Sequence, residues 1–248
     1  MSQAKRYLLT GASSGIGEAL ARELANRGYD LVLAARRIDD LKLLAEELSN
    51  KHGRKILALP LDVTDFAAAQ AIIGQASEAL GGLDGVIANA GIAMSSKVGS
   101  GHFDNDKRVI ETNLTGAIAS LDTATRLFLQ QGHGHLVALA SVAGKVGLPG
   151  NAGYSASKFG LVGYMRTLQS EVTRKGIDCS LLLPGFIDTP LNRDMKSRPF
   201  VISVERGAEL IADHIENRRS FAYVPGWPWA LLAPLLSLLP PSLLGKYF

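Results

Sequence analysis

The chain has 248 residues, with 26 Lys and Arg against 23 Asp and Glu, so its formal net charge is only +3. That length suits one sizeable α/β domain rather than two, and the weak, dispersed charge gives no reason to expect a nucleic-acid partner. Apolar residues make up 47% of the chain, which excludes a disordered protein, and the single cysteine, Cys179, excludes an intramolecular disulfide and a cysteine-built metal cage.

Short apolar runs alternate with longer stretches of helical periodicity. The strand candidates are residues 7–10, 30–35, 56–59, 85–88, 136–139, 177–183 and 221–224. The helix candidates are residues 18–27, 39–50, 66–80, about 107–130, 154–174 and 204–217. The strand runs are continuously apolar, which is typical of parallel strands covered on both faces. We therefore expect an α/β domain over residues 1–225, a doubly wound, parallel seven-stranded sheet with helices on both faces and ligands at the carboxyl ends of the strands.

A glycine-rich turn, Thr-Gly-Ala-Ser-Ser-Gly-Ile-Gly over residues 10–17, joins the first strand candidate to the first helix candidate. A helix N-terminus there offers free N–H groups and a partial positive charge to a diphosphate, and glycines let the backbone approach a ligand. This context predicts dinucleotide binding, with an ordinary Gly/Ser turn as the alternative. The expected binding residues are Gly11, Ser13, Ser14, Gly15, Ile16 and Gly17.

Two arginines, Arg36 and Arg37, follow the second strand candidate, where an acid would bind a ribose 2′-hydroxyl. Guanidinium groups pair with a 2′-phosphate, so this pair favours NADP(H) over NAD(H), and two solvated charges at a helix start are the alternative. Asp62 ends the third strand candidate. It is placed either to accept a hydrogen bond from an adenine amino group or to cap the next helix, a role that Thr64 would also suit.

Tyr154 and Lys158 stand four residues apart in a helix candidate and therefore share one face, and Ser141 ends the fifth strand candidate. Because a free tyrosine has a pKa of about 10, forming its phenolate at pH 7 costs roughly 4 kcal/mol. A nearby ammonium group and an oxidised nicotinamide ring would both lower that cost. We expect Tyr154 to exchange a proton with a carbonyl or alcohol oxygen that Ser141 holds. A surface Tyr–Lys pair is the alternative.

These motifs together resemble those of the short-chain dehydrogenase/reductase family over about residues 5–225. The resemblance implies a Rossmann-type fold and a tetrad of Asn113, Ser141, Tyr154 and Lys158. Asn113 would bind a water that links Lys158 to solvent, Ser141 would orient the carbonyl, and Tyr154 would be the acid/base. Lys158 would also hold the nicotinamide ribose. Further implied cofactor contacts are Asp62, Val63, Asn89, Ala90, Gly91, Pro184, Gly185, Ile187 and Thr189.

The chain departs from the family pattern in two places. Ala88 stands where the family often has asparagine, a change that should be tolerated. No basic residue lies within the glycine-rich turn, so the expected NADP(H) preference rests on Arg36 and Arg37.

Residues 185–203 resemble the family's mobile substrate loop. The apolar side chains expected to line a pocket there are Phe186, Leu191, Met195 and Phe200. The cations of this substrate loop are Arg193, Lys196 and Arg198. We expect them to be solvated, and contact with an anionic head group is the alternative.

Residues 226–248 form an apolar, proline-rich tail, and no charged residue occurs from residue 220 to residue 245. A membrane-spanning helix needs about 20 apolar residues. Prolines break helices, so we expect no span. The prolines are Pro228, Pro234, Pro240 and Pro241. Two interpretations of the tail remain. It lies in a membrane interface, or it packs over the substrate pocket or against another subunit. Both interpretations suggest an apolar substrate. The interfacial residues would be Trp227, Trp229, Lys246 and Tyr247.

The sequence thus predicts an NADP(H)-dependent oxidoreductase that interconverts a carbonyl and an alcohol on a hydrophobic or lipid-like substrate. We expect a cytoplasmic homo-oligomer, a dimer or tetramer, with peripheral membrane contact as one place for the tail. We expect no metal site. The segment that contains His133 and His135 is interpreted as a glycine-rich turn before a strand. The alternatives are a 3-oxoacyl-thioester ketoreductase of lipid synthesis and a non-catalytic NADP(H)-binding regulator or scaffold at a membrane.

Overall fold

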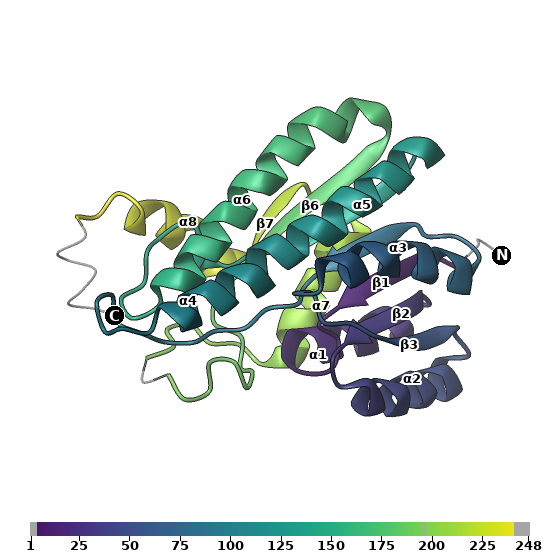
Figure 1. Cartoon of the computed structure of the whole chain (residues 1–248), viewed down its shortest axis with the longest axis horizontal. Helices are drawn as coiled ribbons and strands as arrows, with labels where there is room; N and C mark the ends of the chain where they lie inside the picture. Colours follow the sequence, from purple (N-terminus) through teal and green to yellow (C-terminus); the bar gives the residue numbers. More distant parts are fainter. Residues whose placement is uncertain (1–3, 196, 241–248) are drawn as a thin grey trace.

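The computed structural model describes residues 4–195 and 197–240. Within these residues one sheet holds seven parallel strands in the order β3-β2-β1-β4-β5-β6-β7 (Figure 1). The strands are β1 (Arg6–Thr10), β2 (Asp30–Ala35), β3 (Ile56–Pro60), β4 (Gly85–Ala88), β5 (Gly134–Leu139), β6 (Ile177–Pro184) and β7 (Phe221–Val224). The predicted doubly wound, seven-stranded parallel α/β class is confirmed.

Helices cover both faces of the sheet (Figure 1). They are α1 (Gly15–Asn26), α2 (Ile38–His52), α3 (Phe66–Leu80), α4 (Phe103–Ile110), α5 (Gly116–Gln131), α6 (Ala152–Val172), α7 (Val204–Glu216) and α8 (Gly226–Leu236). Side chains of α1, α2 and α7 join one buried cluster, and side chains of α3, α5, α6 and α8 join the other. Within β1, Tyr7 and Leu9 enter the first cluster and Leu8 the second. This two-sided burial explains the continuously apolar strands.

The helix predicted at about 107–130 begins earlier, at Phe103, and a π-helical turn, Glu111–Thr115, divides it. The turn contains Asn113, which is fully buried. The amide of Asn113 satisfies both backbone groups of Ile92, since its Oδ1 accepts from the Ile92 N–H at 2.8 Å and its Nδ2 donates to the Ile92 carbonyl at 2.9 Å. Hydrophobic periodicity does not show one inserted residue, so the sequence did not predict this turn.

The apolar tail packs onto the domain up to the last described residues. Trp229 is 2% exposed and Ala233 is fully buried, whereas Trp227 is 77% exposed and Leu231 is 52% exposed. The expectation that the prolines break this segment repeatedly is wrong at Pro234, which lies inside α8. A proline there removes only one backbone hydrogen bond, close to the end of the helix. Pro241, Lys246 and Tyr247 lie outside the described residues.

Among the described residues, no helix is both long enough and apolar enough to cross a bilayer. The start of β1 and the end of α8 lie on opposite sides of the molecule (Figure 1).

Candidate active site

A cleft of about 600 Å³ opens along the carboxyl ends of the strands. All the cofactor contacts expected from the sequence line it, together with Ser141. Of the expected tetrad, Asn113 alone does not line the cleft. Lining residues that the sequence reasoning missed are Ala35, Leu61, Ile92, Ala93, Thr112, Leu139, Ala140, Pro190, Asn192 and Asp194. Several of these directly follow or end strands, so the rule that ligands bind at strand carboxyl ends would have found them.

The glycine-rich turn brings backbone segments into direct contact. Gly11 and Gly15 have φ values of +68° and +56°, in the left-handed region that favours glycine. A Cβ atom on Gly17 would overlap the carbonyl oxygen of Gly11. Asn89 donates from Nδ2 to the carbonyls of Thr10 at 2.9 Å and Gly11 at 3.2 Å, which ties β4 to the turn. The turn is therefore fixed by both glycine geometry and Asn89.

The first helix starts three residues earlier than predicted, at Gly15 instead of residue 18, so its N-terminus lies within the glycine-rich turn. Ser14 occupies the N-cap position, and its side chain makes no capping hydrogen bond. Both residues line the cleft. This free hydroxyl and the unpaired N–H groups of the first helical turn fit an anionic group such as a diphosphate.

Arg36 and Arg37 differ in their contacts. Arg37 donates from Nε to Asp40 at 2.8 Å and from Nη2 to the carbonyl of Ser13 at 3.0 Å. Within residues 4–195 and 197–240, Arg36 is exposed, and its guanidinium makes no hydrogen bond or ion pair. Arg36 is therefore the guanidinium that is available to an added phosphate without breaking another contact.

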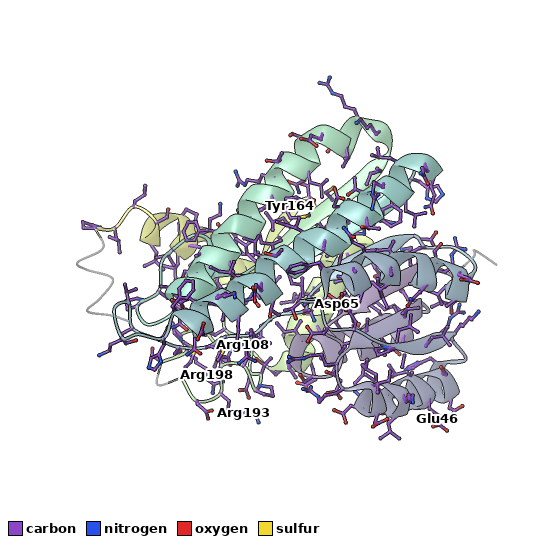
Figure 2. The ribbon with its side chains drawn as sticks, viewed as in Figure 1. Glu46, Asp65, Arg108, Tyr164, Arg193 and Arg198 are labelled. Carbon is purple, nitrogen blue, oxygen red and sulfur yellow. The ribbon has the colours of Figure 1, made fainter. Side chains whose placement is uncertain are left out.

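Asp62 lines the cleft but does not cap a helix. Its Oδ1 accepts from the Thr64 N–H at 3.0 Å and the Thr64 hydroxyl at 2.8 Å. These hydrogen bonds, the backbone one first, hold the pKa of Asp62 below its usual value. The cap of α3 is Asp65, which accepts from the Ala68 N–H at 3.0 Å (Figure 2). The helix-capping alternative for Asp62 and Thr64 is wrong, because Asx-turn geometry uses both side chains before the helix begins.

Tyr154 and Lys158 lie one turn apart on α6. The Nζ atom of Lys158 lies 5.7 Å from the centroid of the Tyr154 ring and donates to the carbonyl of Leu139 at 3.0 Å. Ser141 follows β5 and accepts from the Ala143 N–H at 3.1 Å, which orients its hydroxyl. The three side chains line one part of the cleft.

Burial shifts the pKa values of both titratable side chains. It lowers the pKa of Lys158 to about 8. Burial raises the pKa of Tyr154 above its usual value, and the nearby Ser141 side chain acts in the opposite direction. The expected lowering of the Tyr154 pKa by Lys158 is thus not found in the protein alone, because desolvation is the larger effect. At neutral pH Tyr154 carries its proton.

Asn113 lies behind the cleft and contacts α6 through Ser157. Its Nδ2 donates to the Ser157 hydroxyl at 3.3 Å, and that hydroxyl donates to the carbonyl of Tyr154 at 2.7 Å. Ser157 is fully buried. The sequence reasoning did not single out Ser157, although it stands in the same Tyr-Ser-Ala-Ser-Lys motif. This chain of hydrogen bonds joins the π turn to the helix that carries Tyr154 and Lys158.

The cations of the substrate loop pair with an acid inside the loop. Arg198 forms an ion pair with Asp188, and Arg193 lies 3.9 Å from the same carboxylate. Figure 2 labels both arginines. The Arg198 guanidinium is the main cause that holds the pKa of Asp188 below its usual value. The expectation of solvated cations is therefore wrong for Arg198, because the loop folds back on itself. Lys196 lies outside the described residues.

The apolar residues of the substrate loop divide between the cleft, a buried contact and the surface. Leu191 lines the cleft, and Phe186 is buried against Trp229. Met195 and Phe200 are exposed.

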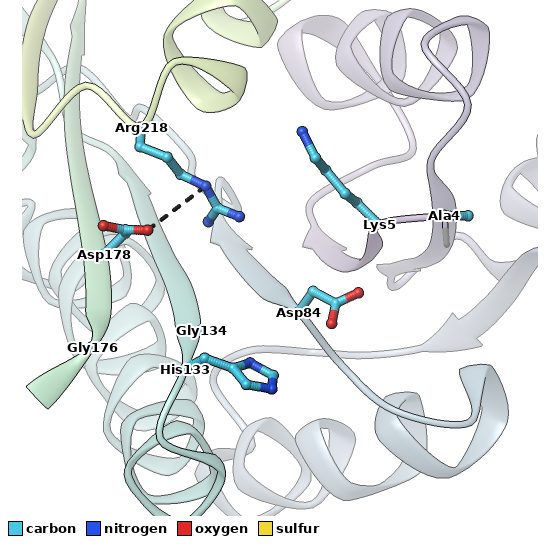
Figure 3. A pocket seen from close by; sticks show the side chains of 8 residues that line it. All are labelled: Ala4, Lys5, Asp84, His133, Gly134, Gly176, Asp178 and Arg218. Atoms are coloured by element: carbon cyan, nitrogen blue, oxygen red, sulfur yellow. Dashed lines mark ion pairs between the residues drawn. The ribbon is translucent and has the colours of Figure 1, made fainter. Parts of the chain in front are cut away.

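A second cavity, of about 370 Å³, lies at the opposite, amino-terminal edge of the sheet (Figure 3). Its charged lining includes Lys5, Asp84 and the pair Arg218–Asp178, whose Nε and Oδ2 atoms are 3.8 Å apart. No residue of the predicted site lines it. Among the described residues, no cluster of metal-ligating side chains occurs there or elsewhere.

His135 is buried in the sheet near this second cavity. Its ring nitrogens contact the Tyr7 hydroxyl at 2.9 Å and the Ser180 hydroxyl at 2.8 Å. The expected turn at His135 is wrong, because β5 begins at Gly134 and includes it.

Comparisons with known proteins extend over nearly the whole chain. The family model for short chain dehydrogenases matches residues 5–199. An uncharacterized oxidoreductase of Mycobacterium tuberculosis is 39% identical over 245 residues, which cover 98% of this chain and 97% of that protein. The 3-oxoacyl-[acyl-carrier-protein] reductase FabG of Escherichia coli is 32% identical over 233 residues, 90% of this chain and 94% of that protein.

Solved structures agree with the sequence comparisons. A short-chain dehydrogenase from Sphingobium yanoikuyae in complex with NADPH superposes with a TM-score of 0.83 and 28% identity, over 96% of this chain and 97% of that chain. A short chain dehydrogenase/reductase from Burkholderia phymatum in complex with NAD gives a TM-score of 0.83 and 26% identity, over 93% and 91%. Similar structures thus include one with each of the two nicotinamide cofactors.

Proposed function

The chain belongs to the short-chain dehydrogenase family, and from that premise we propose that it is an NADP(H)-dependent oxidoreductase that interconverts a carbonyl and an alcohol. One observation carries the proposal. Ser141, Tyr154 and Lys158 line the same cleft as the glycine-rich turn at the N-terminus of α1. This shared cleft supports a role for Tyr154 as proton donor beside a bound dinucleotide.

The proposed reduction needs a hydride and a proton at the substrate carbonyl. The nicotinamide, when bound, supplies the hydride. Tyr154 donates its phenolic proton to the carbonyl oxygen as the C–H bond forms, and the Ser141 hydroxyl hydrogen-bonds to the same oxygen. The phenolate that remains is stabilised by the Lys158 ammonium, one helical turn away. In the reverse direction Tyr154 takes the proton from the alcohol.

The charge states of the two side chains suit this role. With the Tyr154 pKa raised, the phenol holds its proton at neutral pH and is ready to donate it. With a pKa of about 8, Lys158 is mostly charged at pH 7. In this proposal Asn113, linked through Ser157 to α6, keeps the π turn in place and supports proton exchange with Lys158.

For the cofactor we propose NADP(H), with Arg36 as the main contact to the 2′-phosphate. Its exposed, unengaged guanidinium on the cleft supports this assignment, as does the lack of an acid at this position. The other cofactor contacts proposed are those that line the cleft. Asp62 is assigned to the adenine, and the segment from Pro184 to Thr189 is assigned to the nicotinamide.

For the substrate we propose a hydrophobic or lipid-like carbonyl. Leu191 lines the cleft, and Met195, Phe200 and Val201 are exposed apolar residues of the same loop. A second candidate is a 3-oxoacyl thioester, which the 32% identity to the 3-oxoacyl-[acyl-carrier-protein] reductase favours. We also propose a homo-oligomer. The exposed side of α8 would then lie against another subunit or against a membrane surface.

The deciding experiment measures NADPH oxidation with short ketones, long-chain 3-keto compounds, steroidal ketones and a 3-oxoacyl thioester, with and without lipid vesicles. The control is Tyr154→Phe, which removes only the hydroxyl. We expect turnover that rises with substrate chain length and falls about 10²–10⁴-fold in the variant, because general acid catalysis contributes that much. Cofactor affinity should stay within about threefold, since the aromatic ring remains.

Each result has a defined meaning. Turnover that survives in Tyr154→Phe would remove the tyrosine from its proposed role. Turnover of the thioester alone would favour the second candidate. NADPH binding without turnover of any compound would favour a non-catalytic regulator or scaffold.

A further inference from the structure

Trp229 connects the tail to both ends of the substrate loop. Its ring centroid lies 6.0 Å from that of Phe186, at an interplanar angle of 56°, and 6.0 Å from that of Phe200, at 89°. The same indole packs against Gly185, where any Cβ atom would overlap its Nε1 atom. One side chain of α8 therefore contacts the segment that enters the loop and the segment that leaves it.

The two ends of the loop are also joined by backbone hydrogen bonds. The Ile202 N–H donates to the Phe186 carbonyl at 3.1 Å, and the Asp188 N–H donates to the Ile202 carbonyl at 2.9 Å. These hydrogen bonds join Phe186 and Asp188 to Ile202 and close the base of the loop, which we call the neck. Trp229 packs against Phe186 on one side of the neck and against Phe200 on the other. Trp229 therefore packs directly beside this neck.

Phe200, one of the two loop residues that contact Trp229, has an unfavourable backbone conformation. Phe200 has a φ of +57°, in the left-handed region that residues with a side chain rarely adopt. The residue is 54% exposed, so it is not held by burial in the core. Phe200 makes an edge-to-face aromatic contact with Trp229.

The loop side of the neck faces the proposed reaction site. Gly185, Ile187 and Thr189 line the cleft directly after β6, and Leu191 lines it further along. Trp229 itself does not line the cleft, so it acts only through these residues. It also lies beyond residue 199, where the match to the family model ends.

We propose that Trp229 is a positioning residue that holds the substrate loop closed over the cleft and thereby sets the apparent affinity for the carbonyl substrate. This inference rests on the proposed function. When the neck loosens, a smaller fraction of molecules has the loop in place, and the apparent KM rises in inverse proportion to that fraction. The chemical step depends on Tyr154 and Ser141, on α6 and after β5, so kcat changes less.

The kinetic test compares Trp229→Ala with Trp229→Phe, in the absence of lipid. We expect Trp229→Ala to raise the KM for the carbonyl about tenfold with kcat reduced less than about threefold. Trp229→Phe should restore most of the wild-type KM. It keeps an aromatic ring in the contact and loses the smaller ring of the indole with its N–H, which is buried without a partner among the described residues.

The matched control is Trp227→Ala. Trp227 is a tryptophan of the same helix that is 77% exposed, so its removal should leave KM unchanged. Phe200→Ala is the second loop variant. It removes the other half of the contact from an exposed residue, so the fold should survive, and the KM should rise as in Trp229→Ala.

A readout without turnover keeps this inference separate from the proposed function. Arg193 lies in the loop with 63% of its side chain exposed, and it is a trypsin site. Cleavage of a locally opened loop follows the open population, so Trp229→Ala and Phe200→Ala should be cut at Arg193 about tenfold faster than the wild type. Trp227→Ala should be cut at the wild-type rate.

The outcomes separate as follows. Wild-type protein without carbonyl turnover, but with faster cleavage at Arg193 in both variants, would refute the proposed function and keep the loop contact. A Trp229→Ala protein of lower thermal stability, with KM and cleavage unchanged, would overturn the inference. Equal effects of Trp227→Ala and Trp229→Ala would overturn it as well.

Discussion

Arg36 and Arg37 are adjacent in the sequence but have different surroundings in the structure. Both are exposed at the cleft, yet Arg37 already contacts Asp40 and the Ser13 carbonyl. A phosphate would have to compete with those contacts for Arg37, whereas Arg36 has none to lose within the described residues. The sequence alone predicted a pair of equivalent cations, because it does not show which neighbour is engaged.

Arg36→Ala is expected to weaken NADPH binding about 10–100-fold and NADH binding less than about twofold, because a hydrogen bond to a charged group contributes about 1.5–3 kcal/mol. Arg37→Ala should have a smaller effect on NADPH. Titration of both cofactors by fluorescence, for the wild type and the two variants, would measure the six dissociation constants. Equal losses for NADPH and NADH in Arg36→Ala would contradict the assignment of the 2′-phosphate.

Lys158 makes stability depend on pH. Its pKa is about 8 in the folded chain against 10.5 for a free lysine, so between these values the unfolded chain holds the proton that the folded chain has released. Stability therefore rises with pH across that window, by at most about 1.4 kcal/mol per pH unit.

Urea unfolding of the cofactor-free protein at pH 7 to 10 would measure this dependence against Lys158→Met, which cannot titrate. We expect the unfolding free energy of the wild type to increase relative to that of the variant above pH 8. Parallel pH profiles would show that Lys158 is not desolvated as the structure indicates.

Single elements show what sequence patterns capture and what they do not. Apolar runs predicted the strands within about two residues, because burial on both sheet faces leaves a continuous signal. The π turn at Asn113 was not predicted, since it depends on a side chain bonding to the distant backbone of Ile92. The packing of α8 was also open, because apolar composition does not specify whether Trp229 meets a loop, a lipid or another chain.

The glycine-rich turn leads to a prediction at the scale of an element. In Gly17→Ala the new Cβ atom meets the Gly11 carbonyl, so the turn must shift. We expect a loss of about 1–3 kcal/mol in unfolding free energy together with weaker NADPH binding.

The matched control is Gly74→Ala in the interior of α3, where a Cβ atom meets nothing within 4 Å. It should instead gain about 0.5–1 kcal/mol, because alanine is the better helix former. Urea denaturation and cofactor titration of the two variants would check both. Normal NADPH affinity in Gly17→Ala would contradict the proposed binding role of the turn.

At the scale of the whole molecule, a buried polar link crosses the sheet. The Tyr7 ring lies over Gly85 of β4, where any Cβ atom would overlap it, and the Tyr7 hydroxyl reaches His135 on β5. His135 in turn contacts Ser180 on β6. The link joins the half of the sheet with the glycine-rich turn to the half with Ser141 and the substrate loop.

This link predicts acid sensitivity. Burial holds the pKa of His135 well below 6.5, so as the pH falls below 6.5 the unfolded chain takes up a proton that the folded chain does not. The contribution of His135 to stability is therefore complete above pH 6.5 and is lost below it, by up to about 1.4 kcal/mol per pH unit.

His135→Gln removes this titration and keeps polar atoms for Tyr7 and Ser180. Thermal unfolding between pH 7 and 5 should therefore show a steeper decline for the wild type than for the variant. The same decline in both proteins would assign the acid sensitivity to other groups.

The two ends of the described chain lie on opposite sides of the molecule (Figure 1). Residue 4 borders the amino-terminal edge of the sheet, whereas α8 contacts the substrate loop through Trp229. Attaching this protein to a support, a reporter or a partner enzyme is therefore not symmetric. A fusion at the N-terminal side leaves the path to the cleft free, whereas one at the C-terminal side pulls on the helix that holds the loop.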